Sequence, residues 1–265
     1  MTLRIARLSA PLFLAVSLLP VPAMAQHVEY APGTMRFRVS SSTSGSQTTP
    51  GGTASFDIGV EERITLSIMR QAKDTVMAML TLDSISIKSP GPQPDLSKLV
   101  GAKFVSLLSP TGKFYSSRAP EGLDPQLAPI IEGVGKLLPA FPDNLAQGVT
   151  WTDTIKGKVA RMGMDVDLTN VGRYTVEGDT TIGGQKAFRI VRNAAMKGVG
   201  GGSMQGTAVT MEMSSTSAGA FFITPSGSYL GGSAKDNALT RIVVVQQNME
   251  ITIKQSTATT TELIK

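Results

Sequence analysis

The stretch FDIGVEERITLSI, residues 56–68, alternates apolar and polar side chains with a period of two. Successive side chains of a strand point to opposite faces, so this pattern predicts a strand buried on one face. The adjacent Glu61 and Glu62 are expected to point to opposite faces. The predicted core face carries Phe56, Ile58, Val60, Ile64, Leu66 and Ile68. The predicted polar face carries Asp57, Glu61, Arg63, Thr65 and Ser67.

The same alternation continues along the chain from Thr34, between clusters of Gly, Pro, Ser and Asn. In TAVTMEM, residues 207–213, the predicted core face carries Val209, Met211 and Met213. Such a series predicts a mainly β fold, built as one long, curved antiparallel sheet that resembles half of a barrel. The last segment, QSTATTTELIK (255–265), is rich in Ser and Thr, and we expect it to form an exposed edge of the sheet.

Two Pro-x-Gly segments, LLSPTGKFYSS (107–117) and FITPSGSYLGG (222–232), follow apolar runs about 115 positions apart. Proline presets φ and glycine supplies positive φ, so each segment predicts a hairpin turn. Segments 56–66 and 73–80 resemble segments 166–176 and 184–191. One hypothesis is a single domain, 26–265, with related halves 34–120 and 148–263 joined by 121–147. The other is the chance similarity that all amphipathic hairpins share.

Residues 125–138 depart from the strand pattern. Leu127, Ile130, Ile131, Val134, Leu137 and Leu138 recur there at helical spacing. Asp124 is suited to an N-cap and Pro125 to the first helical position, whereas Gly133 and Gly135 weaken a helix. We therefore predict one short helix near 125–138 that connects the two halves.

The N-terminus has the pattern of a bacterial secretory signal peptide. Arg4 and Arg7 precede a short apolar run, and Ala23-Met24-Ala25 forms an A-x-A cleavage site. We predict a signal peptide over 1–25, cleavage after Ala25, no lipobox, and a periplasmic or secreted protein. Loss of two Arg leaves 23 basic residues against 20 acidic ones. Such a small, dispersed excess predicts no nucleic-acid partner.

The chemistry-bearing side chains are sparse. The chain has no Cys, and its one histidine, His27, is expected in a frayed terminus. These absences exclude Ser-His-Asp, Cys-His and His- or Cys-based zinc sites, and we predict no enzyme, no cofactor and no metal. Asp165 and Asp167 are expected on the outer face of a strand. The glycine-rich run KGVGGGSMQG (197–206) precedes a strand rather than a helix, which favours a hairpin loop over a phosphate-binding loop.

Residues 141–232 resemble a family of exported bacterial β-rich proteins of unknown function. The resemblance lies in an ordered series: Phe141-Pro142, Gly-x-x-Trp ending at Trp151, Tyr-x-Val-x-Gly from Tyr174, and Gly-x-x-Ala-x-x-Ile from Gly184. It implies a fold and a compartment rather than an activity. The plan of a curved sheet with one helix is also similar to the half-barrels of periplasmic lipoprotein carriers and mycobacterial lipid carriers.

Two functions remain open at this point. The first is a binding module that holds a lipid or another apolar molecule between the helix and the sheet. Its ligand-binding residues would be Leu127, Ile130, Ile131, Val134, Leu138, Trp151, Met211 and Met213. The second is a structural or interaction protein of the cell envelope with no small-molecule ligand. Since the chain is poor in Trp and Tyr, which form the interfacial girdles of membrane barrels, we expect no integral membrane protein.

Overall fold

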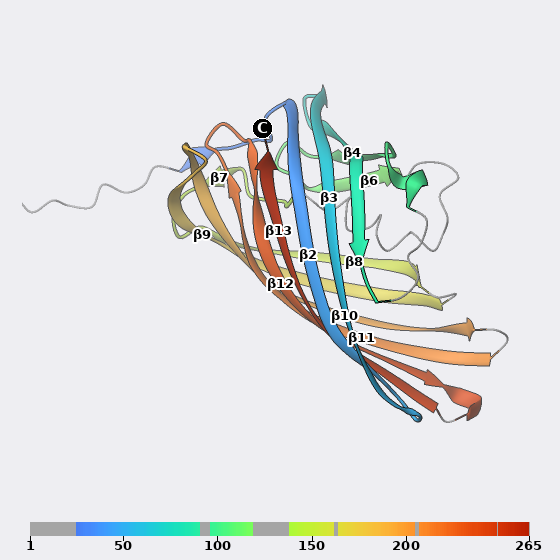
Figure 1. Cartoon of the computed structure of the whole chain (residues 1–265). Helices are drawn as coiled ribbons and strands as arrows, with labels where there is room; N and C mark the ends of the chain where they lie inside the picture. Colours follow the sequence, from blue (N-terminus) through green and yellow to red (C-terminus); the bar gives the residue numbers. More distant parts are fainter. Residues whose placement is uncertain are drawn as a thin grey trace, which may run out of the picture.

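The computed structural model describes residues 25–90, 96–118, 138–161, 164–204, 207–247 and 249–264. These residues form an open, strongly curved antiparallel sheet of 11 strands and a separate two-stranded pair (Figure 1). The sheet order is β6-β5-β4-β3-β2-β13-β12-β11-β10-β9-β8, and the pair is β1-β7. Strands β6 and β8 end the sheet, which is not closed into a barrel. The predicted fold class, a long curved antiparallel sheet, is confirmed.

Most of the strands are unusually long for a globular protein, in which five or six residues are typical. The elements are β1 (Gln26–His27), β2 (Gly33–Thr49), β3 (Gly52–Ala72), β4 (Thr75–Lys88), η1 (Ser97–Leu99), β5 (Lys103–Leu108), β6 (Phe114–Arg118), β7 (Asn144–Leu145), β8 (Thr150–Arg161), β9 (Met164–Ile182), β10 (Gln185–Met204), β11 (Thr207–Ile223), β12 (Tyr229–Val244), η3 (Val245–Gln247) and β13 (Met249–Ile264).

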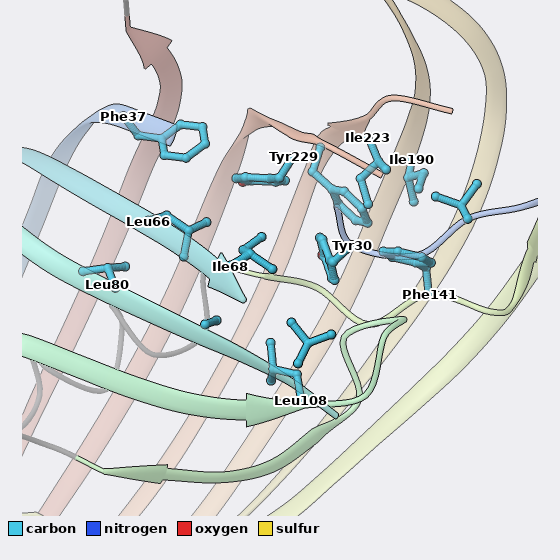
Figure 2. Close-up of a cluster of buried hydrophobic side chains, with 14 of the residues drawn as sticks. Tyr30, Phe37, Leu66, Ile68, Leu80, Leu108, Phe141, Ile190, Ile223 and Tyr229 are labelled. Carbon is cyan, nitrogen blue, oxygen red and sulfur yellow. The ribbon is translucent and has the colours of Figure 1, made fainter. Parts of the chain in front are cut away.

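One face of the sheet, which we call the inner face, packs around a large apolar core at one end of the strands. We call this core cluster 1. Figure 2 shows Tyr30 and Phe141 among side chains from several strands. Cluster 1 includes Val28, Tyr30, Phe37, Ile64, Leu66, Ile68, Val76, Leu80, Leu82, Phe104, Leu108, Phe141, Leu145, Tyr174, Val176, Phe188, Ile190, Phe221, Ile223 and Tyr229. The predicted alternation is confirmed here, since Ile64, Leu66 and Ile68 are buried while Glu61 and Arg63 are exposed.

The C-terminal strand β13 lies in the middle of the sheet, between β12 and β2. The prediction of an exposed edge was wrong. The Ser and Thr residues of β13 meet similar residues of β2, as in the hydrogen bond between Thr43 Oγ1 and Thr257 Oγ1 of 2.8 Å. Such cross-strand Thr pairs stabilise a sheet without apolar side chains. The Ser and Thr residues of 255–265 therefore indicated a polar strand in the middle of the sheet rather than an edge strand.

The glycine-rich run also differs from the prediction. Residues 197–204 belong to strand β10 and pair with β9 and β11, so a loop over this run is wrong. A Cβ on Gly198 would lie 2.5 Å from Leu168 Cδ2, and one on Gly200 would lie 2.7 Å from Val166 Cγ2. The glycines are needed because side chains of β9 lie directly over them.

The two Pro-x-Gly segments form hairpin turns, β5–β6 and β11–β12, with the same hydrogen bonds. In the first, Lys113 N donates to Ser109 Oγ at 2.9 Å, and Gly112 has φ +87°. In the second, Ser228 N donates to Thr224 Oγ1 at 2.9 Å, and Gly227 has φ +88°. Both predicted hairpin turns are therefore confirmed.

The turns also hold the segment that follows the predicted cleavage site. Tyr30 N donates to Pro110 O at 2.8 Å, and Ala31 N donates to Gly227 O at 3.0 Å. His27 lies in β1, and its Nδ1 is 2.9 Å from Asp143 O. The expectation of a frayed terminus at His27 was wrong, because the neighbouring Val28 and Tyr30 are buried in cluster 1.

The predicted helix lies almost entirely outside the described residues. Leu138, its last predicted residue, is described; it lies in a bend and packs against cluster 1. The helical elements among the described residues are the short 3-10 helices η1 and η3. No helix in this part of the chain is long and apolar enough to span a bilayer. The predicted signal peptide also lies outside the described residues, except for Ala25.

Candidate functional site

The inner face has a second apolar cluster at the opposite end of strands β9 to β13, which we call cluster 2. Two of its members, Met164 and Val166, have no exposed surface. The buried members are Met164, Val166, Val209, Met211, Ile242 and Val244, and the partly buried ones are Leu168, Met213, Met249 and Ile251. Cluster 2 is separate from cluster 1, so the same sheet face carries two apolar regions.

Between the two clusters the inner face is lined mainly by small side chains. We call this region the band: Gly172, Arg192, Ala194, Ser215, Ser217, Gly219, Ala234, Asp236, Ala238, Thr257 and Thr259. The strand registers place these residues on the face of Met211 and Phe221. Every one of them is buried or half-buried, whereas most of their neighbours on the outer face are exposed. The band therefore has little side-chain volume of its own.

Aromatic side chains border the band on the side of cluster 1. The rings of Trp151 and Tyr174 stack with centroids 5.1 Å apart and planes 6° apart. Trp151 Nε1 donates to Ala140 O at 3.2 Å, and Tyr174 contacts Phe221 edge-on at 6.3 Å. Gly172 makes room for this arrangement, because a Cβ there would lie 2.9 Å from the Tyr174 ring.

Arg192 is the one basic residue of the band. Its side chain lies beside Tyr174, which is directly opposite on β9. Burial raises the pKa of Tyr174, with the nearby Asp153 acting in the same direction and Arg192 opposing it. The Arg192 Nε atom is buried and has no hydrogen-bond partner, and the same is true of Ser217 Oγ. Buried polar atoms are nearly always hydrogen-bonded, which makes this pair unusual.

Glu62 lies on the inner face at the edge of cluster 1, opposite Val39 on β2 and Ile85 on β4. Burial against these apolar neighbours raises the pKa of its carboxyl. By contrast Glu61, its neighbour in sequence, is exposed on the outer face. The predicted opposite orientation of the two glutamates is confirmed.

The predicted ligand-binding residues fall into three groups. Leu127, Ile130, Ile131 and Val134 lie outside the described residues. Leu138 and Trp151 pack against cluster 1, and Met211 and Met213 belong to cluster 2. The structure therefore places the four described residues on the inner face, with the band between the two pairs.

Sequence reasoning missed Arg192, Ser217 and the other residues of the band. Arg192 stands at an inner position of RIVRNAAM, where the alternation of residues 189–196 places Ile190, Arg192, Ala194 and Met196 on one face. A lone basic residue in an otherwise apolar face was the available signal. Ser217 gave none, because the surrounding SSTSAGA has no apolar alternation.

The outer face of the sheet carries a shallow hollow, and the described residues offer no metal-binding group. A hollow of about 370 Å³ on the sheet is lined by residues that include Ser40, Ser42, Glu61, Lys88 and Thr260. Most of these side chains point to the outer face, and none is buried. In the described part of the chain no group of three or more His, Asp or Glu residues could hold a metal ion.

Comparison with known proteins gives no relative: no protein-family model matches the chain, and a search of curated proteins finds no match. The resemblance of residues 141–232 to exported bacterial proteins therefore stays a prediction.

Proposed function

We propose that this chain is a non-enzymatic exported protein that binds a lipid or another apolar molecule on the inner face of its sheet. The observation that carries the proposal is the band of small, half-buried side chains between two apolar clusters. Ligand sites are typically concave and mostly apolar, with a few polar groups that fix orientation. The open half-barrel supplies the concave form, and the clusters supply apolar contacts at both ends.

Native mass spectrometry tests this proposal on the mature chain, residues 26–265, purified without detergent from an expressing bacterium. We expect a bound species of lipid mass that leaves when the protein is extracted with organic solvent and refolded. The extracted protein should then bind an added apolar probe saturably. A protein that carries no small molecule and binds no probe would contradict the proposal.

Export is the second part of the proposal and rests on the predicted signal peptide. Its support is that Gln26 and His27, the first residues after the predicted cleavage site, already pair with β7. Expression of the full chain in a bacterium, followed by N-terminal sequencing of the periplasmic and medium fractions, tests it. We expect the sequence to begin at Gln26. An uncleaved chain in the cytoplasm would rule out the predicted compartment.

The second candidate is an interaction protein of the cell envelope that recruits a partner strand. It is favoured by the two terminal strands of the sheet, β6 and β8. Phe114 and Tyr115 on β6 are each 52% exposed, and Ile155 on β8 is 48% exposed. Apolar edge strands are natural sites for strand addition. Crosslinking from residue 155 in intact cells should capture a protein partner under this candidate and none under the first.

A further inference from the structure

The polar groups of the band are arranged around Arg192. The strand registers place Arg192 of β10 between Tyr174 of β9 and Gly219 of β11. Ser217 is two residues from Gly219 on the same face, opposite Ala194. Arg192 and Ser217 are thus diagonal neighbours on adjacent strands, where cross-strand side chains can act on one group.

Both side chains offer a hydrogen-bond donor that nothing in the described structure accepts. Arg192 Nε and Ser217 Oγ are buried and have no partner. A guanidinium can only donate, and a hydroxyl can donate, so the missing group is an acceptor. Among the described residues Arg192 forms no direct ion pair, and the carboxylates of Asp153 and Asp236 on the same face are two strands away. A negatively charged acceptor fits both donors, and such hydrogen bonds are the stronger kind.

Acidic side chains on both sides limit the charge that this place accepts. Asp153 on β8 and Asp236 on β12 face the same side, each two strands away from Arg192, and Asp236 lies directly opposite Ser217. They would repel a second negative charge. A group with one negative charge, such as a carboxylate or a phosphodiester, therefore fits better than a dianion.

The surroundings indicate what is attached to the charged group. Tyr174 and Trp151, whose rings stack, lie beside Arg192 in the same row across the sheet. Toward cluster 1 the next inner positions are Ile190 and Phe221, which are buried and pair with each other. Toward cluster 2 the next inner positions are Met196 and then Met213, both half-buried. Methionine side chains adapt to apolar partners of irregular shape. An apolar chain attached to the charged group can therefore extend over the methionines toward cluster 2.

We propose that Arg192 and Ser217 bind the singly charged acid head group of an amphipathic molecule whose apolar chain lies over Met196 and Met213. This inference rests on the proposed function and adds the chemical class of the ligand and its direction. A fatty acid and an acidic phospholipid share this chemistry.

The test uses delipidated mature protein and two matched probes, dansylaminoundecanoic acid and its methyl ester. Trp151 is the one tryptophan of the chain and borders the band, so energy transfer from Trp151 to the dansyl group reports binding. We expect the acid to bind about tenfold more tightly than the ester, which corresponds to the strength of one charge-assisted hydrogen bond. Competition by phosphatidylglycerol or by unlabelled fatty acid then distinguishes the two natural sources of the head group.

The variants are Arg192→Gln, Ser217→Ala and, as a control, Arg173→Gln. Arg173 is an exposed residue on the outer face of β9, opposite Asn193. We expect Arg192→Gln to reduce the affinity for the acid to the affinity for the ester. The affinity for the ester should stay unchanged. Ser217→Ala should lower the affinity for the acid severalfold, and Arg173→Gln should change the affinity for neither probe.

The outcomes separate this inference from the proposed function. Equal binding of acid and ester to the unmodified protein would overturn the head-group assignment and leave the proposed function standing. That comparison needs no variant, so it holds even if Arg192→Gln fails to fold. Binding of neither probe would overturn the proposed function and the inference with it.

Discussion

Gly227 illustrates how one residue positions the segment that carries Val28 and Tyr30. It has φ +88°, and a Cβ there would lie 1.6 Å from Glu29 O. A substitution would both strain the turn and push away the segment that carries Val28 and Tyr30, each 1% exposed. The hydrogen bond from Ala31 N to Gly227 O would be lost in the process.

We expect Gly227→Ala to lower the free energy of unfolding by about 2–5 kcal/mol, the sum of left-handed strain and overpacking. Gly184→Ala is the matched control, because Gly184 has φ +82° with nothing within 4 Å of its Cβ position. Gly184→Ala should lower the free energy of unfolding by only about 1–2 kcal/mol. Urea denaturation of both variants measures the difference, and equal losses would show that contact with the N-terminal segment is unimportant.

Glu62 predicts a pH dependence of stability. Burial raises the pKa of its carboxyl in the folded protein, so the folded state holds the proton at pH values where the unfolded state has released it. Glu62 therefore lowers the free energy of unfolding as the pH rises from the unfolded value of 4.5 through the folded pKa. Below that window the contribution is constant and the carboxyl is neutral in both states.

We expect Glu62→Gln to unfold at a higher temperature than the unmodified protein at pH 7, because glutamine carries no charge to desolvate. The difference should shrink as the pH falls below 4.5. Glu61→Gln, at an exposed outer position, is the control and should show no such trend. Thermal melts across this pH range test the idea, which fails if both variants behave alike.

At the scale of elements, strand β10 has room for a side chain at some of its glycine positions and none at others. Gly200 faces inward, where a Cβ would lie 2.5 Å from Asp165 O and 2.7 Å from Val166 Cγ2. Gly201 faces outward, and the nearest atom to a Cβ there is Val209 O at 3.5 Å. The same substitution at adjacent positions of one strand should therefore have opposite effects.

We expect Gly200→Ala to lower the free energy of unfolding by about 1–3 kcal/mol, because the added methyl group overpacks against Val166. Gly201→Ala should be neutral or stabilise by up to about 1 kcal/mol, since alanine reduces the entropy of the unfolded chain. Chemical denaturation of the two variants measures these effects. A loss at Gly201 as large as that at Gly200 would contradict the account of β10.

The sequence predicted the strands and their faces but not their neighbours. The period of two in residues 56–68 and 207–213 identified the inward-facing positions correctly, because each strand turns one face toward the interior. The position of strand β13 was predicted wrongly, because Ser and Thr are equally suited to an exposed edge strand and to a polar strand in the middle of the sheet. The glycine run was taken for a loop, since only the neighbouring Leu168 and Val166 explain why glycine is required.

The candidate site was predictable only in part. Trp151, Met211 and Met213 were identified because large apolar residues stand out in a strand pattern. Arg192 and Ser217 were missed, since their significance lies in two unpartnered atoms on adjacent strands. That relationship depends on the register between β10 and β11, which alternation within one strand does not determine.

At the scale of the whole molecule, the sheet has two apolar ends and a middle lined by small side chains. Cluster 1 is closed by the N-terminal segment and by residues 139–145, as Figure 2 shows for Tyr30 and Phe141. This end serves stability. The band and the adjoining methionines are the part of the inner face to which we assign binding.

Nuclear magnetic resonance of the methionine methyl groups tests that assignment most directly. The delipidated mature protein, labelled with ¹³C at its methionine methyls, is titrated with dodecanoic acid. Met196 and Met213 border the band, whereas Met69 is 39% exposed on the outer face and serves as the internal control. We predict saturable shifts of the Met196 and Met213 signals with Met69 unchanged. Unchanged Met196 and Met213 signals at saturating dodecanoic acid would contradict the account.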